Sequence, residues 1–295
     1  MNNFTCAVIG SKGYIGSHIV GYLRSIGIRP LCYDVVDCSD IDYCMVDLTK
    51  IEELSKIDFS VDYIFLFAGL TGTYAGFDNA EKYIVINELG LANLLNAIRE
   101  SKYRPKVIFP SSRLVYKGSD RPLREDDSKE TKTIYAVNKL ACEGLLNAYY
   151  QSFDIPYTVF RICIPYGNFV SNDYSFGTIG FFLRQAKSGK NITLYGGGNI
   201  KRTFTHIKDI CHQIVECSLQ RESDGEIYNI GGETMSLYEA ATIIANKYNV
   251  EVVATEWPYR DLRIESGHTY FDDSKIKSLI SIDCYKSIKD FTQDL

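Results

Sequence analysis

The sequence predicts an α/β protein with a doubly wound parallel sheet, followed by a smaller C-terminal α/β domain. Three observations support this fold class. Strand-like and helix-like segments alternate through the first half of the 295 residues, as expected for repeated β-α-β units. A glycine-rich turn separates the first strand from the first helix. The segment 63–67 (YIFLF) is a continuous apolar run, which is typical of a strand that is covered on both faces.

The elements of the first half follow a regular order. We expect strands at 4–9, 31–33, 63–67, 107–109 and 157–162, with a short strand that ends near Val46. The spacing of apolar residues predicts helices at 14–25, 81–101 and 133–151. Residues 1–165 are therefore assigned to one domain.

The regular alternation of predicted strands and helices ends after about Tyr166. We expect a loop at 171–180, helices at 181–187, 206–219 and 237–249, and strands at 226–232 and 250–255. Segment 192–204 is interpreted as a strand with a glycine-rich turn. Residues 166–295 are assigned mainly to a smaller substrate domain, and residues 204–232 are expected to pack back onto the first sheet.

Composition excludes several classes of function. The net charge of −5 argues against a nucleic-acid-binding protein, which normally carries a basic face. The N-terminal residues lack the features of a signal peptide, and no apolar run reaches the roughly 20 residues that span a bilayer. We therefore expect a soluble, cytoplasmic protein that is not bound to a membrane. The nine cysteines contain no CxxC pair and the four histidines are scattered, so no metal site is predicted.

The turn after the first strand has the spacing GxxGxxG, with Gly10, Gly13 and Gly16. Tyr14 and Ile15 begin the helix that follows. Such a turn lets a diphosphate approach the backbone and the N-terminal N–H groups of the helix. The turn therefore predicts a dinucleotide-binding site, although an ordinary tight turn explains the glycines equally well when they are considered alone.

Asp34 strengthens the prediction of a dinucleotide site. It ends the second strand 24 residues after Gly10, where a carboxylate can accept hydrogen bonds from both ribose hydroxyls of adenosine. The same carboxylate would repel a 2′-phosphate, and no lysine or arginine follows it directly. The predicted cofactor is therefore NAD rather than NADP.

Ser112, Tyr135 and Lys139 are the candidate catalytic residues. Ser112 follows a predicted strand, and Tyr135 and Lys139 lie four residues apart, on one face of a predicted helix. A nearby ammonium lowers the pKa of a phenol toward a range in which it can act as a base. A second Tyr-x-x-x-Lys pair, Tyr285 and Lys289, has no serine-bearing strand before it and is interpreted as a surface pair on a helix.

These motifs together resemble the extended short-chain dehydrogenase/reductases, in particular the NAD-dependent nucleotide-sugar epimerase/dehydratase group. The similarity covers nearly the whole chain. The motifs that carry it occur in the expected order: GSKGYIG, VDL, FAGLTGT, INELGLANLL, PSSRLVY, YAVNK, RICIPYG, KRTFTHIKDI and YNIGG.

The resemblance implies a Rossmann-type sheet, a nucleotide-sugar substrate and a homodimer built on two helices of each subunit. Tyr135 and Lys139 are expected to contact the cofactor in addition to their catalytic role. The resemblance also adds six residues to the cofactor site: Asp47, Leu48, Ala68, Gly69, Asn87 and Ile162.

The departures from the family pattern reduce the number of reaction types that fit this sequence. Family 4,6-dehydratases carry two acids directly after the catalytic hydroxyl residue, where this chain has Arg113 and Leu114. Neither side chain can do that acid–base work, so a dehydratase is disfavoured. An NAD-dependent 4-epimerase is preferred over a 4-keto-6-deoxy-sugar reductase. A further alternative, outside the enzymes, is a dinucleotide-sensing regulator that has the same fold but no catalytic activity.

The resemblance also indicates how the substrate is held. Ser112 and Tyr135 are expected to hold the substrate oxygen, with Thr71 beside them. Tyr195 is expected to pack on the nucleotide base, and Arg202 to bind the phosphates, with Arg263 as a looser candidate. Ile164 replaces the asparagine that usually contacts the phosphates in this family, so the nucleotide and the sugar are left open.

Overall fold

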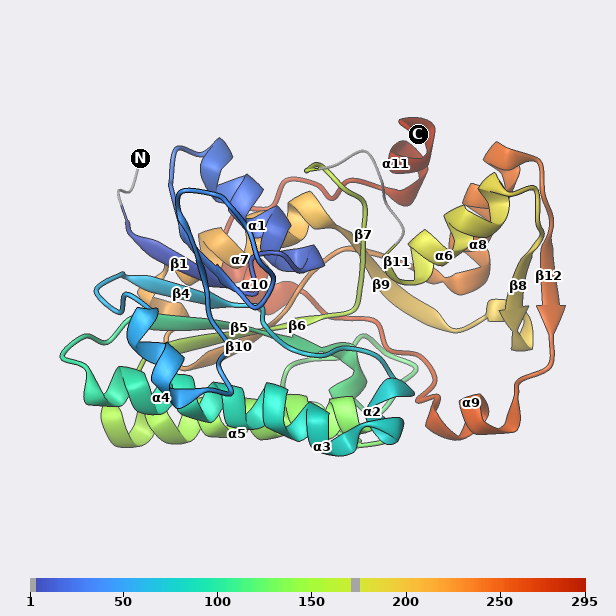
Figure 1. Cartoon of the computed structure of the whole chain (residues 1–295). Helices are drawn as coiled ribbons and strands as arrows, with labels where there is room; N and C mark the ends of the chain where they lie inside the picture. The colour runs from blue at the N-terminus through green and yellow to red at the C-terminus, as the bar shows by residue number, and fades with distance from the viewer. Residues whose placement is uncertain (1–3, 171–175) are drawn as a thin grey trace.

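The computed structural model describes residues 4–170 and 176–295. Figure 1 shows a main sheet with helices on both faces, and a smaller part at the opposite end of the molecule. The main sheet has seven parallel strands in the order β10-β6-β5-β4-β1-β2-β3. The strands are β1 (Cys6–Ile9), β2 (Leu31–Asp34), β3 (Tyr43–Met45), β4 (Tyr63–Leu66), β5 (Lys106–Ser112), β6 (Tyr157–Ile162) and β10 (Glu226–Asn229). The predicted fold class is confirmed.

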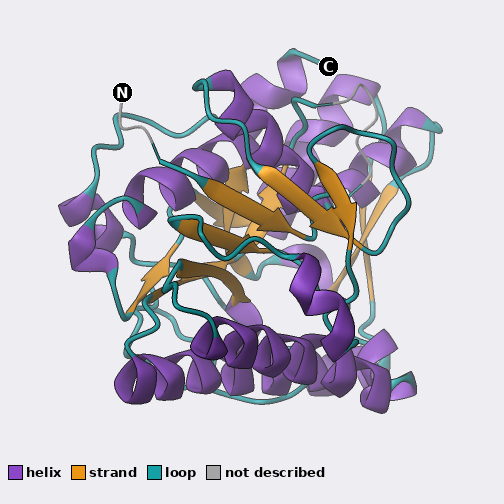
Figure 2. Cartoon of the chain, turned by 60° about the vertical axis from the view of Figure 1, so that its left-hand side comes forward, coloured by secondary structure: helices purple, strands orange, loops and turns teal. Residues whose placement is uncertain are grey.

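Helices cover both faces of this sheet, as Figure 2 shows. Alternate residues of β1 belong to different cores, because successive side chains of a strand point to opposite faces. Cys6 and Val8 pack with the helices α1 and α7, whereas Ala7 and Ile9 pack with α4 and α5. The bounds are α1 (Tyr14–Ser25), α4 (Gly90–Glu100), α5 (Ile134–Phe153) and α7 (Ile207–Ser218).

A continuous helical run precedes α4 and matches the helix predicted at 81–101. It consists of α3 (Ala80–Tyr83), the π-helical segment η2 (Ile84–Leu89) and α4 itself. A short helix, α2 (Ala75–Asp78), comes just before it. The 3₁₀ turns of the described residues are η1 (Ile51–Lys56), η3 (Arg113–Val115), η4 (Gly196–Gly198) and η5 (Arg221–Ser223).

The smaller part has its own apolar core and two small sheets, of order β11-β9-β7 and β12-β8. Its strands are β7 (Ile164–Tyr166), β8 (Ile192–Tyr195), β9 (Lys201–His206), β11 (Glu233–Ser236) and β12 (Val252–Thr255). The later helices are α6 (Gly177–Lys187), α8 (Leu237–Tyr248), α9 (Tyr259–Ile264), α10 (Ser274–Leu279) and α11 (Ile288–Gln293).

The chain returns to the main sheet after it has entered the smaller part. Strand β10 pairs with β6, and α7 packs against α1. Residues 207–229 therefore complete the sheet that the first half begins. The division at residue 165 stays a prediction. No helix among the described residues is long and apolar enough to cross a membrane.

Three local predictions are wrong. Segment 192–204 holds two strands in different sheets, because the glycines of η4 turn the chain with positive φ angles. Residues 177–180 of the predicted loop belong to α6, while residues 171–175 lie outside the described part. Tyr285 precedes α11 and donates a hydrogen bond to Asp273, so it does not form a helical pair with Lys289.

Candidate active site

Two adjoining cavities open at the carboxyl ends of β1, β4 and β5. The larger has a volume of about 630 Å³ and the smaller about 300 Å³. They share walls formed by Gly13 and by the loop from Phe67 to Leu70. Strand order reverses direction between β1 and β4, and such switch points are where open α/β sheets bind ligands.

The glycines of the first turn are required for two different reasons. A Cβ on Gly10, whose φ is +85°, would lie 2.2 Å from the backbone nitrogen of Ala68, and one on Gly16 would lie 2.0 Å from the carbonyl oxygen of Gly10. These two glycines allow close packing of backbone on backbone. Gly13 lines both cavities, and its Cβ would meet only the Gly10 carbonyl, at 3.3 Å. It therefore leaves space on the cavity side of the turn.

Helix α1 begins directly at this turn. Its N-cap is Gly13, which provides no side-chain cap for the first N–H groups. Tyr14, Ile15 and Gly16 line the smaller cavity, where the N-terminal end of the helix carries partial positive charge. The Tyr14 hydroxyl donates to the carbonyl of Gly167 at 2.7 Å.

Asp34 lies at the far end of the larger cavity and is tied to the glycine turn. Its Oδ2 accepts from the backbone N–H of Lys12 at 2.8 Å, and its Oδ1 accepts from the N–H of Val35 at 2.8 Å. The Lys12 ammonium instead lies 3.0 Å from Asp40. The ammonium of Lys12 is thus paired with another carboxylate, and the carboxylate of Asp34 stays available at the cavity wall.

Asp47 and Leu48 form another wall of the larger cavity. The Asp47 carboxylate accepts from the backbone and the hydroxyl of Thr49, at 3.0 and 2.7 Å. The Leu48 carbonyl accepts from the side chain of Asn93 at 2.9 Å. These bonds fix the loop after β3, so the structure brings both predicted residues to the same cavity as Asp34.

Asn87 holds the wall between the two cavities. Its Oδ1 accepts from the N–H of Leu70 at 2.7 Å, and its Nδ2 donates to the Leu70 carbonyl at 3.1 Å. Ala68 and Gly69 line both cavities, whereas Asn87 is buried behind them. Asn87 lies in the π-helical segment, a feature that is frequent at functional sites. Its contacts are those of a residue that positions the loop.

Ser112, Tyr135 and Lys139 meet in the smaller cavity, together with Thr71 and Ile162. Ser112 ends β5, while Tyr135 and Lys139 lie in the first two turns of α5. The hydroxyl of Thr133 caps α5 by accepting from the N–H of Ala136 at 3.1 Å. The cap fixes where the helix begins and therefore which residues face the cavity.

The electrostatics of this group depend mainly on burial. Burial raises the pKa of Tyr135, and a hydrogen bond with the Ser112 side chain acts in the opposite direction. Burial lowers the pKa of Lys139 to about 8. The Lys139 Nζ donates to the carbonyl of Pro110 at 2.6 Å and lies 5.6 Å from the centre of the Tyr135 ring. A charged ammonium at this distance favours the phenolate form of Tyr135.

A buried ion pair joins the elements that carry the candidate catalytic residues. Arg161 on β6 and Glu143 on α5 form a bidentate pair, with Nη2–Oε2 at 2.6 Å and Nε–Oε1 at 3.0 Å. The Ser111 hydroxyl donates to the same carboxylate at 2.5 Å. Because Ser111 precedes Ser112 and Glu143 is one turn beyond Lys139, the pair links β5, β6 and α5 next to the candidate catalytic residues.

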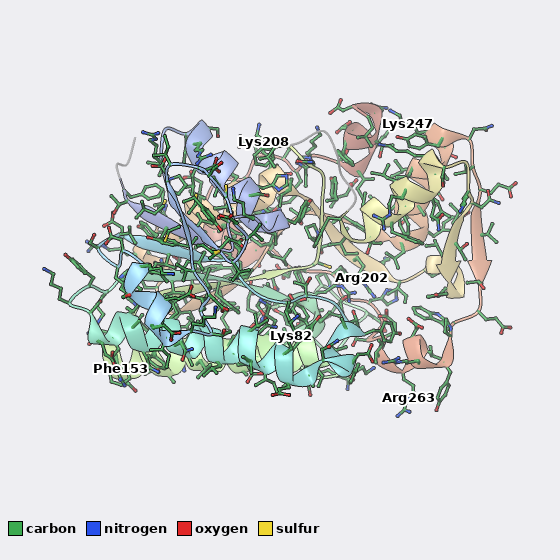
Figure 3. All side chains as sticks on the ribbon, in the orientation of Figure 1. Lys82, Phe153, Arg202, Lys208, Lys247 and Arg263 are labelled. Carbon is green, nitrogen blue, oxygen red and sulfur yellow. The ribbon has the colours of Figure 1, made fainter. Side chains whose placement is uncertain are left out.

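The residues expected at the substrate end are spread more widely. Arg202 is 1% exposed and pairs with Glu265 at 2.7 Å, and it also donates to the Gly267 carbonyl at 2.6 Å. Tyr195 is 43% exposed and packs against Trp257, with ring centres 5.4 Å apart. Arg263 extends from α9 away from the body of the molecule (Figure 3). The structure brings none of the three to the walls of the two cavities.

Sequence reasoning missed several residues of these walls. Phe176 lines the smaller cavity and stacks on Tyr14 at 4.1 Å between ring centres, and Lys82 lines the larger one. Trp257, the single tryptophan, was not connected with Tyr195. Only the aromatic character of Phe176 and Trp257 could have suggested them, because neither lies in a motif that the sequence analysis recognised.

A family model described as "NAD dependent epimerase/dehydratase family" matches residues 6–231, which is more than half of the chain and includes all three catalytic candidates. The chain belongs to this family. The predictions of the family, of an NAD-dependent enzyme and of NAD as its cofactor are thereby confirmed. Within residues 4–170 and 176–295, no cluster of three or more metal-binding side chains occurs.

Some relatives of this family member are similar to it over almost the whole chain. A Bacillus subtilis protein described as "Uncharacterized UDP-glucose epimerase YtcB" is 28% identical in an alignment that covers 96% of this chain and 94% of the relative. Solved structures also share its fold. Among them are Pal from Bacillus thuringiensis (TM-score 0.86, 20% identity, 98% of this chain and 96% of the other) and a Bacillus cereus UDP-glucuronic acid 4-epimerase in complex with UDP-glucuronic acid and NAD (TM-score 0.84, 21% identity, with the same shares).

Proposed function

We propose that the protein is an NAD-dependent nucleotide-sugar 4-epimerase. The observation that carries the proposal is the convergence of Ser112, Tyr135 and Lys139 in one cavity that opens beside the glycine turn. Membership of the epimerase/dehydratase family, and the relative described as a UDP-glucose epimerase, support the same reaction class.

The three side chains have distinct roles in this proposal. Tyr135 removes the proton from the sugar 4-hydroxyl and later returns it. Ser112 holds the same oxygen, and the Lys139 ammonium stabilises the phenolate and binds the cofactor ribose. Bound NAD supplies the acceptor and donor of the hydride.

The proposed cofactor site runs along both cavities. The diphosphate fits at Gly13 and the beginning of α1, where Gly10 and Gly16 keep the backbone compact. Asp34 would accept from the adenosine ribose, with Asp47 and Leu48 beside the adenine, and Ala68, Gly69 and Ile162 would line the path to the nicotinamide. Tyr14 and Ile15 lie at the helix end, and Asn87 acts by fixing the loop.

Replacing Asp34 tests the cofactor end. We expect Asp34→Ala to weaken NAD binding about 10- to 100-fold, because hydrogen bonds to a charged group contribute about 1.5–3 kcal/mol. The preference for NAD over NADP should fall at the same time, since the repulsive charge is gone. Calorimetric titration with both dinucleotides measures these changes.

The matched control is Asp37→Ala, which removes an exposed carboxylate three residues away, outside the cavity wall. It should leave NAD affinity unchanged. Equal NAD affinity in the Asp34 variant and the native protein would contradict the assignment of Asp34.

At the substrate end we propose that Thr71 contacts the sugar beside Ser112 and Tyr135. Tyr195, with Trp257, offers an exposed aromatic surface for the base. Arg202 remains the proposed phosphate ligand, on the condition that substrate competes with Glu265 for its guanidinium. Arg263, which is exposed on α9, is the remaining proposed substrate contact.

The lowered pKa of Lys139 predicts an alkaline limit to turnover. The pKa of Lys139 is about 8, so the ammonium is present below this pH and is lost above it, together with its support for the phenolate. We expect kcat to fall as the pH rises through about 8. The fall would not reflect unfolding caused by this residue. The pKa of lysine is about 10.4 in an unfolded chain, so between about pH 8 and 10.4 the unfolded chain holds a proton that folded Lys139 has lost. The contribution of Lys139 to the free energy of unfolding therefore rises as the pH rises through this range.

Lys129 supplies the control for this profile. Burial also lowers its pKa to about 8, but its Nζ lies over the ring of Tyr116, 4.8 Å from the ring centre. We expect Lys129→Gln to retain the alkaline limb. A native profile that stays flat through pH 8, with the protein folded throughout, would argue against the role of Lys139.

The decisive experiment is a panel of UDP-, dTDP-, GDP- and CDP-hexoses and their 4-keto-6-deoxy forms. Absorbance reports the nicotinamide and chromatography reports the products. An epimerase converts a substrate without net consumption of cofactor. Steady consumption of reduced cofactor would instead identify the reductase, and a folded, NAD-binding protein without turnover would identify the regulator.

We also propose a homodimer formed through the helices of the lower layer in Figure 1. Ile84 and Leu89 of η2 and Val137 of α5 are exposed apolar residues on these helices, which lie side by side. Burial of such side chains against a second copy would be favourable. Sedimentation of the protein in solution tests this proposal.

A further inference from the structure

Arg113 is a half-buried arginine next to the catalytic serine, and the reaction proposed above gives it no role. Its neighbours in the chain, Ser112 and Leu114, both line the smaller cavity, as does Cys163. The Arg113 guanidinium donates to the hydroxyl of Thr269 at 3.2 Å, and the Cys163 thiol donates to the carbonyl of the same Thr269 at 3.3 Å. Arg113 is not itself one of the lining residues, and these contacts place its guanidinium on Thr269, next to the lining residue Cys163.

The charge of Arg113 is not balanced within the described part of the chain. No carboxylate there lies within 4 Å of its guanidinium, whereas the nearby Arg202 is paired with Glu265. Burial and the charge of Arg113 together lower the pKa of Arg202 to about 10. Two guanidinium groups thus share the surroundings of one carboxylate. A half-buried cation in such surroundings is stabilised by an anion that binds beside it.

The position of Arg113 indicates which part of a nucleotide sugar this anion is. In the proposed reaction, Ser112 and Tyr135 hold the oxygen on C4 of the sugar. Arg113 follows Ser112 directly, with Cα atoms about 3.8 Å apart, so its backbone lies next to the residue that holds this oxygen. The substituent on C5 is adjacent to C4, whereas the diphosphate leaves from C1 on the opposite side of the ring.

We propose that Arg113 binds a carboxylate on C5 of the sugar, so that the substrate is a nucleotide hexuronic acid. This inference rests on the proposed function for the placement of the C4 oxygen. A guanidinium offers five N–H groups in a fixed fork that fits a carboxylate with two parallel bonds. The bond to Thr269 engages one N–H, which leaves the others for the substrate.

Binding without turnover tests the proposal. In the NAD-loaded Tyr135→Phe variant, we expect calorimetry to give at least about 10-fold tighter binding of UDP-glucuronic acid than of UDP-glucose. Arg113→Gln should weaken UDP-glucuronic acid about 10- to 100-fold, as expected for the loss of a charged hydrogen-bonded pair. The same change should leave UDP-glucose and UDP within about threefold of their starting affinity.

Two further variants make the test specific. Thr269→Val keeps the shape of a buried residue but removes the acceptor that orients Arg113, so it should weaken only UDP-glucuronic acid, by less than Arg113→Gln. Arg29→Gln removes a side chain that is 82% exposed and far from the cavity walls, and should change neither affinity.

The outcomes separate this inference from the proposed function. Equal weakening of UDP-glucuronic acid, UDP-glucose and UDP in Arg113→Gln would assign the arginine to the diphosphate and overturn the proposal. The proposal would also be overturned if the protein bound UDP-glucuronic acid no more tightly than UDP-glucose, or did not bind UDP-glucuronic acid at all. If UDP-glucuronic acid binds through Arg113 but the protein with Tyr135 intact does not interconvert its C4 epimers, the substrate class stands and the epimerase assignment fails.

Discussion

Replacing Tyr135 by phenylalanine is expected to lower kcat by about 10²- to 10⁴-fold, the range contributed by a positioned general acid–base group. The change removes only the hydroxyl that exchanges the proton. The ring, which lies 5.6 Å from the Lys139 ammonium, would keep its place in the cavity wall. NAD affinity should therefore stay within about threefold of the native value, as measured by calorimetry alongside turnover.

Tyr149 offers a matched control on the same helix. Its hydroxyl donates to Asn96 at 2.8 Å and lies outside both cavities. Tyr149→Phe should leave kcat within about twofold of the native value. Undiminished turnover in the Tyr135 variant would remove the proposed mechanism, although it would leave the family and the fold as they are.

The second large effect concerns stability rather than chemistry. Arg161 and Glu143 are 2% and 7% exposed, and removing one partner leaves a buried charge without its counterion. We expect Glu143→Ala to lower the free energy of unfolding by about 3–5 kcal/mol. Denaturant titration measures this loss. In the native protein burial lowers the pKa of Arg161, but Glu143 and Tyr116 outweigh that effect. A guanidinium stays protonated in proteins, so the variant keeps the buried charge after Glu143 is removed.

A double replacement separates charge from packing. Glu143→Leu combined with Arg161→Met removes both charges and should be less destabilising than Glu143→Ala, because no uncompensated charge remains. The pair of Arg121 and Asp127 is the control, because the Arg121 side chain is 61% exposed, and Arg121→Gln should cost no more than about 1 kcal/mol. If Glu143→Ala also lowered the free energy of unfolding by no more than about 1 kcal/mol, water would have to reach the buried pair.

The parts of the site that could be predicted from the sequence are those set by short-range constraints. The glycine turn must follow a strand and begin a helix, and a tyrosine and a lysine four residues apart must share a helix face. Residues 14–25 and 157–162 were predicted to the residue because each is a single apolar pattern between clear turns.

Contacts between distant segments could not be predicted in the same way. Arg202 is paired with Glu265, 63 residues later, and nothing in the sequence around either residue signals that pair. The same holds for Phe176, which stacks on Tyr14, and for Arg113, whose partner Thr269 is 156 residues away. Each depends on how the smaller part folds against the main sheet.

The return of β10 and α7 to the main sheet means that the two parts of this enzyme are interlocked rather than modular. A fragment that stops at residue 165 would leave the edge of β6 without its neighbour, and a row of isoleucines on α7 would no longer shield Ile108 and Phe160. Such a fragment has an open strand edge next to bare apolar surface, a combination that favours aggregation. Domain exchange between members of this family would therefore need breakpoints that keep residues 207–229 with the first half of the chain.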